Sequence, residues 1–159
     1  MKHTLSVLVE NQPGVLTRVA GLFARRGFNI ESLAVGESED PGLSRIIITI
    51  DGAEHPIDQV TKQLHKLINV VKIRDLEPQS TVCVELMLVK VNTEGDRRTE
   101  VLQVAEIFKA KIVDVDRRTL TLQVTGSTDK LEALLALLRP HGVLELVRTG
   151  TVAIGRGRP

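Results

Sequence analysis

The chain has 159 residues, of which 42% are hydrophobic and 26% charged, and its net charge is +1; this composition is ordinary for a globular protein. Residues 1–78 carry nine Lys and Arg against ten Asp and Glu, and residues 79–159 carry twelve against ten. The balance argues against a protein that binds nucleic acid or anionic lipid. No apolar run approaches the ~20 residues that span a membrane.

The rarer residue types restrict the class of protein further. Three Phe, no Trp and no Tyr leave a core of Val, Leu and Ile, and β-branched residues favour strands. The single Cys83 excludes an internal disulfide and a cysteine-based metal site, and suits a reducing compartment. Because the first predicted strand begins near residue 4, no room remains for a signal or transit peptide. We therefore expect a cytoplasmic protein.

In the first half, hydrophobic periodicity alternates between the patterns of strands and helices. Apolar residues at helical spacing follow Pro13, and Arg25, Arg26 and Gly27 are typical of a helix end. A second helix is expected to begin at Pro56, which suits a first helical position. The predicted strands cover residues 4–10, 29–36, 43–50 and 70–76.

The second half repeats this order after a short linker, Glu77–Ser80. The predicted strands cover residues 81–91, 111–115, 120–125 and 143–148, and the predicted helices cover residues 98–109 and 128–138. Residues 155–159 are expected to form a mobile tail.

The fold class is therefore α+β, with two tandem ferredoxin-like βαββαβ units covering residues 1–78 and 79–159. This topology predicts the strand order 4-1-3-2, which leaves strand 29–36 at an edge of the first sheet. That edge carries no Pro or Lys to block pairing. Pairing with the same strand of a second copy would remove the edge, so we expect a homodimer.

Residues 11–33 contain the main candidate site. The backbone N–H groups at Gly14–Leu16 would lie at a helix start, where amides lack helical acceptors and can bind a carboxylate. Asn11 and Asn29 are expected to lie close together, with side-chain oxygens that accept hydrogen bonds from an ammonium group. These features fit a small zwitterion such as an amino acid. The alternative is that both Asn residues and Gly14 are ordinary cap and turn residues.

The sequence offers no convincing catalytic or metal-binding group. The histidines at positions 3, 55, 65 and 141 lack the spacing of metal ligands, so no metal site is expected. Asp114 and Asp116 project from one strand face and are expected to face solvent. The Arg25–Arg26, Arg97–Arg98 and Arg117–Arg118 pairs are interpreted as solvated charges, and no glycine-rich phosphate loop or nucleophile elbow is present.

Several longer segments carry a family resemblance. Residues 5–33 closely resemble the start of the small, regulatory subunit of acetolactate synthase, also called acetohydroxyacid synthase. The likeness continues through residues 40–45, 62–67, 106–115 and 144–150. The resemblance implies an N-terminal ACT domain, roughly residues 4–78, and a C-terminal domain of related fold. It also implies a role in branched-chain amino acid biosynthesis.

ACT domains of this type pair edge to edge and bind an amino acid at the interface. The resemblance implies valine as the usual effector, leucine or isoleucine as alternatives, and an effector site formed by Asn11, Gly14, Val15, Leu16, Asn29 and Ile30. The implied partner is a catalytic subunit that holds thiamine diphosphate, Mg²⁺ and FAD and that this non-catalytic chain activates and subjects to feedback inhibition.

Two other functions remain open on sequence grounds. The chain could be a free-standing ACT-domain sensor that regulates another partner, which would need a nucleic-acid-binding module if it controlled transcription. It could also be an enzyme acting on an acyl phosphate, which would need an Arg–Asn pair at a phosphate-binding loop. Arg25 and Arg26 lie at the wrong end of their helix for that chemistry.

Overall fold

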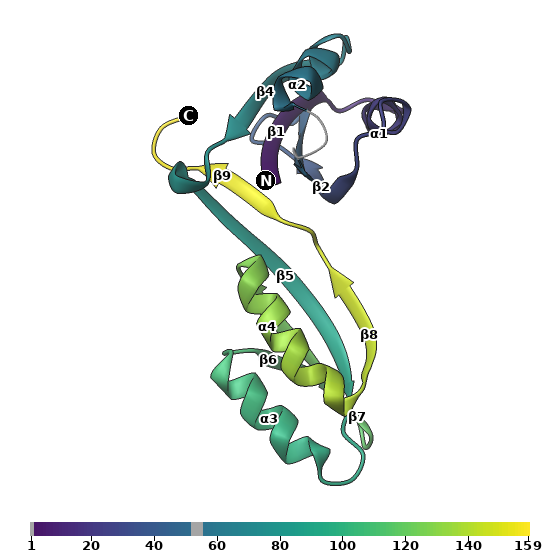
Figure 1. Cartoon of the computed structure of the whole chain (residues 1–159), viewed down its shortest axis with the longest axis vertical. Helices are drawn as coiled ribbons and strands as arrows, with labels where there is room; N and C mark the ends of the chain where they lie inside the picture. Colours follow the sequence, from purple (N-terminus) through teal and green to yellow (C-terminus); the bar gives the residue numbers. More distant parts are fainter. Residues whose placement is uncertain (1, 52–55) are drawn as a thin grey trace. The chain divides into compact units, whose positions relative to one another are not determined.

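A computed structural model describes residues 2–51 and 56–159. The chain forms two compact units (Figure 1). The first contains the residues up to Cys83 together with Thr151–Pro159, and the second contains Val84–Gly150. This division differs in two respects from the boundary expected from the sequence at residues 78/79. The structural division falls at 83/84, and the residues from Thr151 onward belong to the first unit.

The first unit contains a four-stranded antiparallel sheet with the order β2-β3-β1-β4. This is the predicted 4-1-3-2 arrangement, with β2 at an edge. The strands are β1 (Lys2–Glu10), β2 (Ile30–Glu37), β3 (Leu43–Asp51) and β4 (Val70–Leu76), and the helices are α1 (Val15–Arg25) and α2 (Ile57–His65).

The core of the first unit lies between the sheet and these helices. Alternate residues of the central strands, including Val7 and Ile48, are fully buried there. Helix α1 adds Val15, Val19, Leu22 and Phe23, whose spacing places them on one helical face. Gly27, with φ of 73°, directly follows the C-cap residue of α1 and takes the left-handed conformation that glycine accepts most readily.

The second unit repeats the topology with the order β6-β7-β5-β8. Its first strand, β5, begins after a 3-10 turn (Pro78–Ser80) and crosses the division at 83/84. Its second helix is followed by another 3-10 turn (Arg139–His141). The repeated topology confirms the predicted fold class. The elements of the second unit are β5 (Thr81–Asn92), α3 (Arg97–Ile107), β6 (Lys111–Val115), β7 (Thr119–Gly126), α4 (Thr128–Leu138) and β8 (Val143–Arg148).

One face of the first sheet carries no helices, yet it has buried hydrophobic side chains. In the first unit, Ile47 and Leu76 on that face are each 5% exposed. An additional strand, β9 (Val152–Gly155), pairs with β5 and also lies against β1 and β4. Just before it, the amide of Thr151 donates to Ser32 Oγ at 2.8 Å, and a Cβ atom added at Gly155 would lie 3.0 Å from Arg74 Nη2. The predicted mobile tail is thus wrong for Gly155, which ends β9, and for Arg156, whose amide donates to the Ser80 carbonyl at 2.7 Å.

Candidate functional site

The loop between β1 and α1 is fixed by backbone hydrogen bonds on both sides. The amide of Glu10 donates to the carbonyl of Asn69 at 2.9 Å, and the amide of Asn11 donates to the carbonyl of Gly42 at 3.0 Å. Arg18 of helix α1 also donates to Asn69 Oδ1 at 2.6 Å. The exposed Asn11 side chain therefore stands on a backbone whose position is well defined.

Gly14 occupies the N-cap position of α1 with φ of 84° and ψ of −6°. A residue with a Cβ atom is strained in this left-handed conformation, whereas glycine adopts it freely. A Cβ atom built at Gly14 meets nothing within 4 Å, so a side chain there has space and would project into the region in front of the helix start. No side chain caps α1 at this end.

The amides at this helix start are only partly available. Val15 donates to the Gln12 carbonyl at 3.3 Å, and its side chain is buried in the core, which corrects the expectation that all amides at Gly14–Leu16 are free. Within the described residues, the amides of Gly14, Leu16 and Thr17 have no backbone acceptor. A carboxylate placed here would meet these donors and the positive end of the helix dipole.

Asn29 and Ile30 lie at the other end of the sheet. Ile30 pairs with Ile50, which in turn pairs with His3 at the beginning of β1. Asn11, by contrast, follows the last residue of β1. The expectation that Asn11 and Asn29 lie close together in one chain is therefore wrong. The reason is that helix α1 runs back along the sheet, so β2 starts beside His3, eight residues before Asn11 on β1 and therefore about 26 Å away at ~3.3 Å per residue.

Among the described residues, no group of three His, Cys, Asp or Glu side chains could hold a metal ion; His55 lies outside them. Asp114 and Asp116 are exposed, as expected. Cys83 is a free, exposed thiol.

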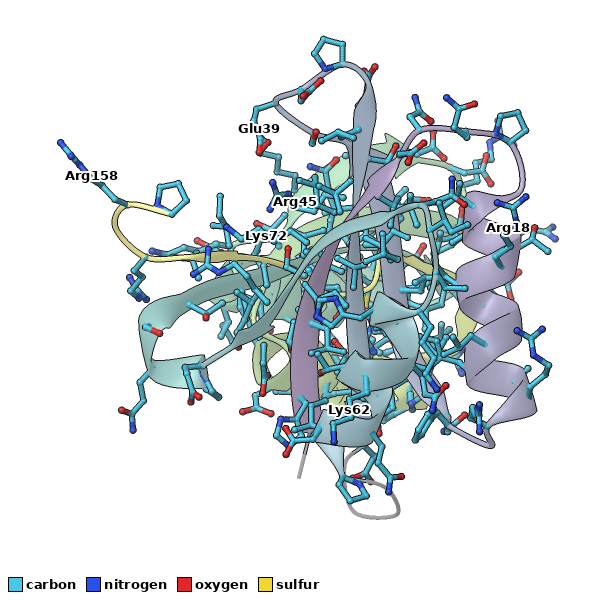
Figure 2. All side chains as sticks on the ribbon, turned by 90° about the horizontal axis from the view of Figure 1, so that it is seen from above. Arg18, Glu39, Arg45, Lys62, Lys72 and Arg158 are labelled. Atoms are coloured by element: carbon cyan, nitrogen blue, oxygen red, sulfur yellow. The ribbon has the colours of Figure 1, made fainter. Side chains whose placement is uncertain are left out.

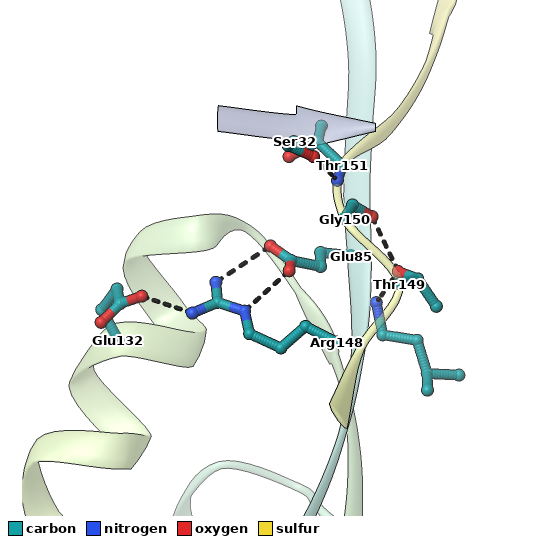
Figure 3. A network of polar contacts seen from close by, with 8 residues as sticks. Ser32, Glu85, Glu132, Arg148, Thr149, Gly150 and Thr151 are labelled. Atoms are coloured by element: carbon teal, nitrogen blue, oxygen red, sulfur yellow. Dashed lines mark hydrogen bonds and ion pairs between the residues drawn. The ribbon is translucent and has the colours of Figure 1, made fainter. Parts of the chain in front are cut away.

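A buried ion pair in the second unit was missed at the sequence level (Figure 3). Arg148 at the end of β8 donates to both oxygens of Glu85 on β5, at 2.7 and 3.0 Å, and also to Glu132 on α4. Its hydrogen bonds to Glu85 raise the pKa of Arg148. Glu85 is only 5% exposed. The pair ties together the two strands by which the chain enters and leaves the second unit.

The tandem ferredoxin-like units and the open helix start in the first of them define a regulatory protein of the ACT-domain class. Comparisons with known proteins agree. Residues 5–72 match the family of AHAS small subunit-like ACT domains, and residues 84–157 match the family described as the small subunit of acetolactate synthase. No helix within the described ranges is long and apolar enough to cross a membrane.

Individual relatives match over nearly the whole chain. The acetolactate synthase small subunit of Mycobacterium leprae is 52% identical over 98% of this chain and 92% of its own length. That of Mycolicibacterium smegmatis is 49% identical over 98% and 91%. The crystal structure of the Thermotoga maritima small subunit has a TM-score of 0.92 at 45% identity and covers 100% of this chain and 99% of that one. The chain belongs to the acetolactate synthase small subunit family and is a regulatory, not a catalytic, subunit.

Proposed function

We propose that this chain stimulates a thiamine-diphosphate-dependent acetolactate synthase catalytic subunit in the cytoplasm and makes it sensitive to valine. Thiamine diphosphate, Mg²⁺ and FAD would belong to the catalytic subunit. The family membership supports the partnership. The observation that carries effector binding is the open helix start at Gly14, where the amides of Leu16 and Thr17 have no backbone acceptor in the described chain.

A homodimer would complete the effector site. Edge strand β2 has eight residues, and antiparallel pairing with the same strand of a second copy places the start of one beside the end of the other. The end of β2, Glu37, pairs with Ser44, which pairs with Val9 near the end of β1. Such pairing would bring the partner's Asn29 and Ile30 toward Asn11, Gly14, Val15 and Leu16.

The chemistry of the two half-sites fits an aliphatic amino acid. The amides at the start of α1 would hold its carboxylate, and the oxygens of Asn11 and the partner's Asn29 would accept hydrogen bonds from its ammonium group. Leu16 and Val35, which are 43% and 47% exposed in the single chain, would cover its side chain. An aliphatic pocket separates homologous ligands by only ~1–3 kcal/mol per methylene, so leucine and isoleucine should compete weakly with valine.

The first experiment is a valine titration of acetolactate formation by the cognate catalytic subunit, with and without this chain. Stimulation that valine reverses supports the proposal. Stimulation that valine leaves unchanged supports the partnership with the catalytic subunit but refutes valine as the effector. Leucine and isoleucine would then be tested. Absence of stimulation refutes the proposed function and favours a free-standing amino-acid sensor.

The shared site can be tested by complementation between subunits. Asn11→Ala and Asn29→Ala dimers should each lose valine binding. The two variants are then mixed so that their subunits exchange. In each heterodimer both substitutions fall in the same one of the two sites, so the second site has an unchanged Asn11 and an unchanged Asn29. Calorimetry should then detect about one valine per heterodimer. Failure to recover any binding in confirmed heterodimers would refute a site shared between subunits.

Gly14→Asp tests the carboxylate position. The new side chain has room and would place a negative charge where the ligand carboxylate is expected, so valine inhibition should disappear. Gly14→Asn is the matched control, since Asn tolerates the left-handed conformation better than most residues and adds no charge. If folded Gly14→Asp retains normal inhibition, the carboxylate is bound elsewhere.

A further inference from the structure

Three cationic side chains gather on the helix-free face of the first sheet. Arg45 on β3 and Lys72 on β4 are both paired with Leu8 of the intervening strand β1, and Arg74 is paired with Ser6. Since adjacent strands lie ~4.8 Å apart, Arg45 and Lys72 are about 10 Å apart at their Cα atoms. We call these three residues the basic cluster. Figure 2 shows Arg45 and Lys72 on the same side of the sheet.

The basic cluster surrounds a cavity of about 180 Å³ whose lining includes Ser6 and Leu8. Two of its side chains have defined positions. Arg45 donates to both carboxylate oxygens of Glu39, at 2.6 and 3.1 Å, and to Ser6 Oγ at 3.4 Å. Arg74 lies against β9 so closely that a Cβ atom at Gly155 would come within 3.0 Å of its Nη2 atom. The Arg45 guanidinium is thus held by Glu39 and Ser6, and that of Arg74 lies beside β9.

The charges at this cavity do not cancel. Glu39 is the carboxylate side chain in the lining, against three cations, and within the described chain Lys72 and Arg74 make no ion pair. Pro159 of the C-terminal segment also lines the cavity, whereas Arg156 and Arg158 do not.

We propose that the basic cluster is the docking surface for an acidic segment of the catalytic subunit. This inference rests on the proposed function, which supplies the partner. The three cations extend over two strands, with Arg45 on β3 and Lys72 and Arg74 on β4, which suits several carboxylates presented by a protein surface better than one small anion. Complementary charge of this kind steers association and fixes the orientation of a complex.

The test is stimulation of the cognate catalytic subunit by the double variant Lys72→Glu/Arg74→Glu. The concentration of this chain that gives half-maximal stimulation should rise about tenfold or more at low salt. The half-maximal concentrations of the double variant and of the wild type should approach each other as NaCl is raised toward ~0.5 M, because salt screens exposed charges. The charge-conserving Lys72→Arg/Arg74→Lys variant should stay within about threefold of the wild type.

The matched control is Lys62→Glu/Lys66→Glu, which makes the same charge change on exposed residues at helix α2. If both double variants raise the half-maximal concentration equally, the loss comes from the change in total charge and not from the basic cluster, and the inference is refuted. The proposed function would be unaffected by that result. If the wild type itself gives no stimulation, the proposed function fails and the inference with it. Should Lys72→Glu/Arg74→Glu not fold, the single exposed Lys72→Glu is expected to show a shift of about threefold; no shift would overturn the proposal.

Discussion

The buried ion pair of the second unit allows a quantitative prediction. Replacement of Arg148 by Met keeps most of the side-chain volume but leaves the Glu85 carboxylate, which is 5% exposed, without its cationic partner. Removing one member of a fully buried pair costs ~3–5 kcal/mol. Because the Arg148 side chain is 23% exposed and water can reach the vacated position, we expect a loss of about 2–3 kcal/mol of unfolding free energy.

Urea denaturation followed by circular dichroism measures this loss. A double-mutant cycle with Glu85→Gln separates the pair from its surroundings: the Arg148→Met/Glu85→Gln variant should lose less than the sum of the single variants, by about 1–2 kcal/mol. The control is Lys90→Met, which breaks an exposed pair with Glu145 in the same sheet and should cost less than about 1 kcal/mol. Equal losses for Arg148→Met and Lys90→Met would refute the reasoning.

Three further predictions concern stability and are checked by denaturant unfolding. Ile48→Ala empties a fully buried core position and should cost ~2–5 kcal/mol, whereas Ile68→Ala, at a residue that is 93% exposed, should change stability by less than about 0.5 kcal/mol. Ser127 caps α4 by accepting a hydrogen bond from the Lys130 amide at 3.2 Å, so Ser127→Ala should cost about 1 kcal/mol, and Ser127→Asp should not. Gly142 has φ of 99°, so Gly142→Ala should cost ~1–3 kcal/mol, and an unaffected variant would contradict this.

Most of the fold could be predicted because local patterns determine its elements. The predicted strands 70–76, 111–115 and 143–148 and the helix 128–138 have the bounds found in the structure. Strand β9 was missed because it has only four residues and is held by partners distant in sequence. The hydrogen bond from Thr151, directly before β9, to Ser32 joins residues 119 positions apart. No local pattern contains that information.

The candidate site was predicted less completely than the fold. The residue types at the start of α1 indicate an anion site, but the distance between Asn11 and Asn29 depends on the direction of α1 relative to the sheet. The basic cluster depends on the registers of β1 with β3 and of β1 with β4. The alternation of Lys72 and Arg74 was the local indication that two cations share a face, although their proximity to Arg45 follows only from strand order.

The two units share one topology, but an amino-acid site is expected in only one of them. The residues at the two corresponding helix starts explain this difference. The corresponding helix start in the second unit, that of α3, has Asp96 at its N-cap position and Glu100 in its first turn. Arg97 and Arg98 lie in the same turn and balance these two charges in number, but the Asp96 carboxylate stands at the N-cap itself, where a ligand carboxylate would have to bind. Helix α1 has Gly14 at this position and no acidic residue in its first turn, and neither helix has a side-chain cap. The two helix starts thus have the same place in the fold but differ at the N-cap, where α3 has an acidic side chain and α1 has a glycine. This difference favours effector binding at the first unit.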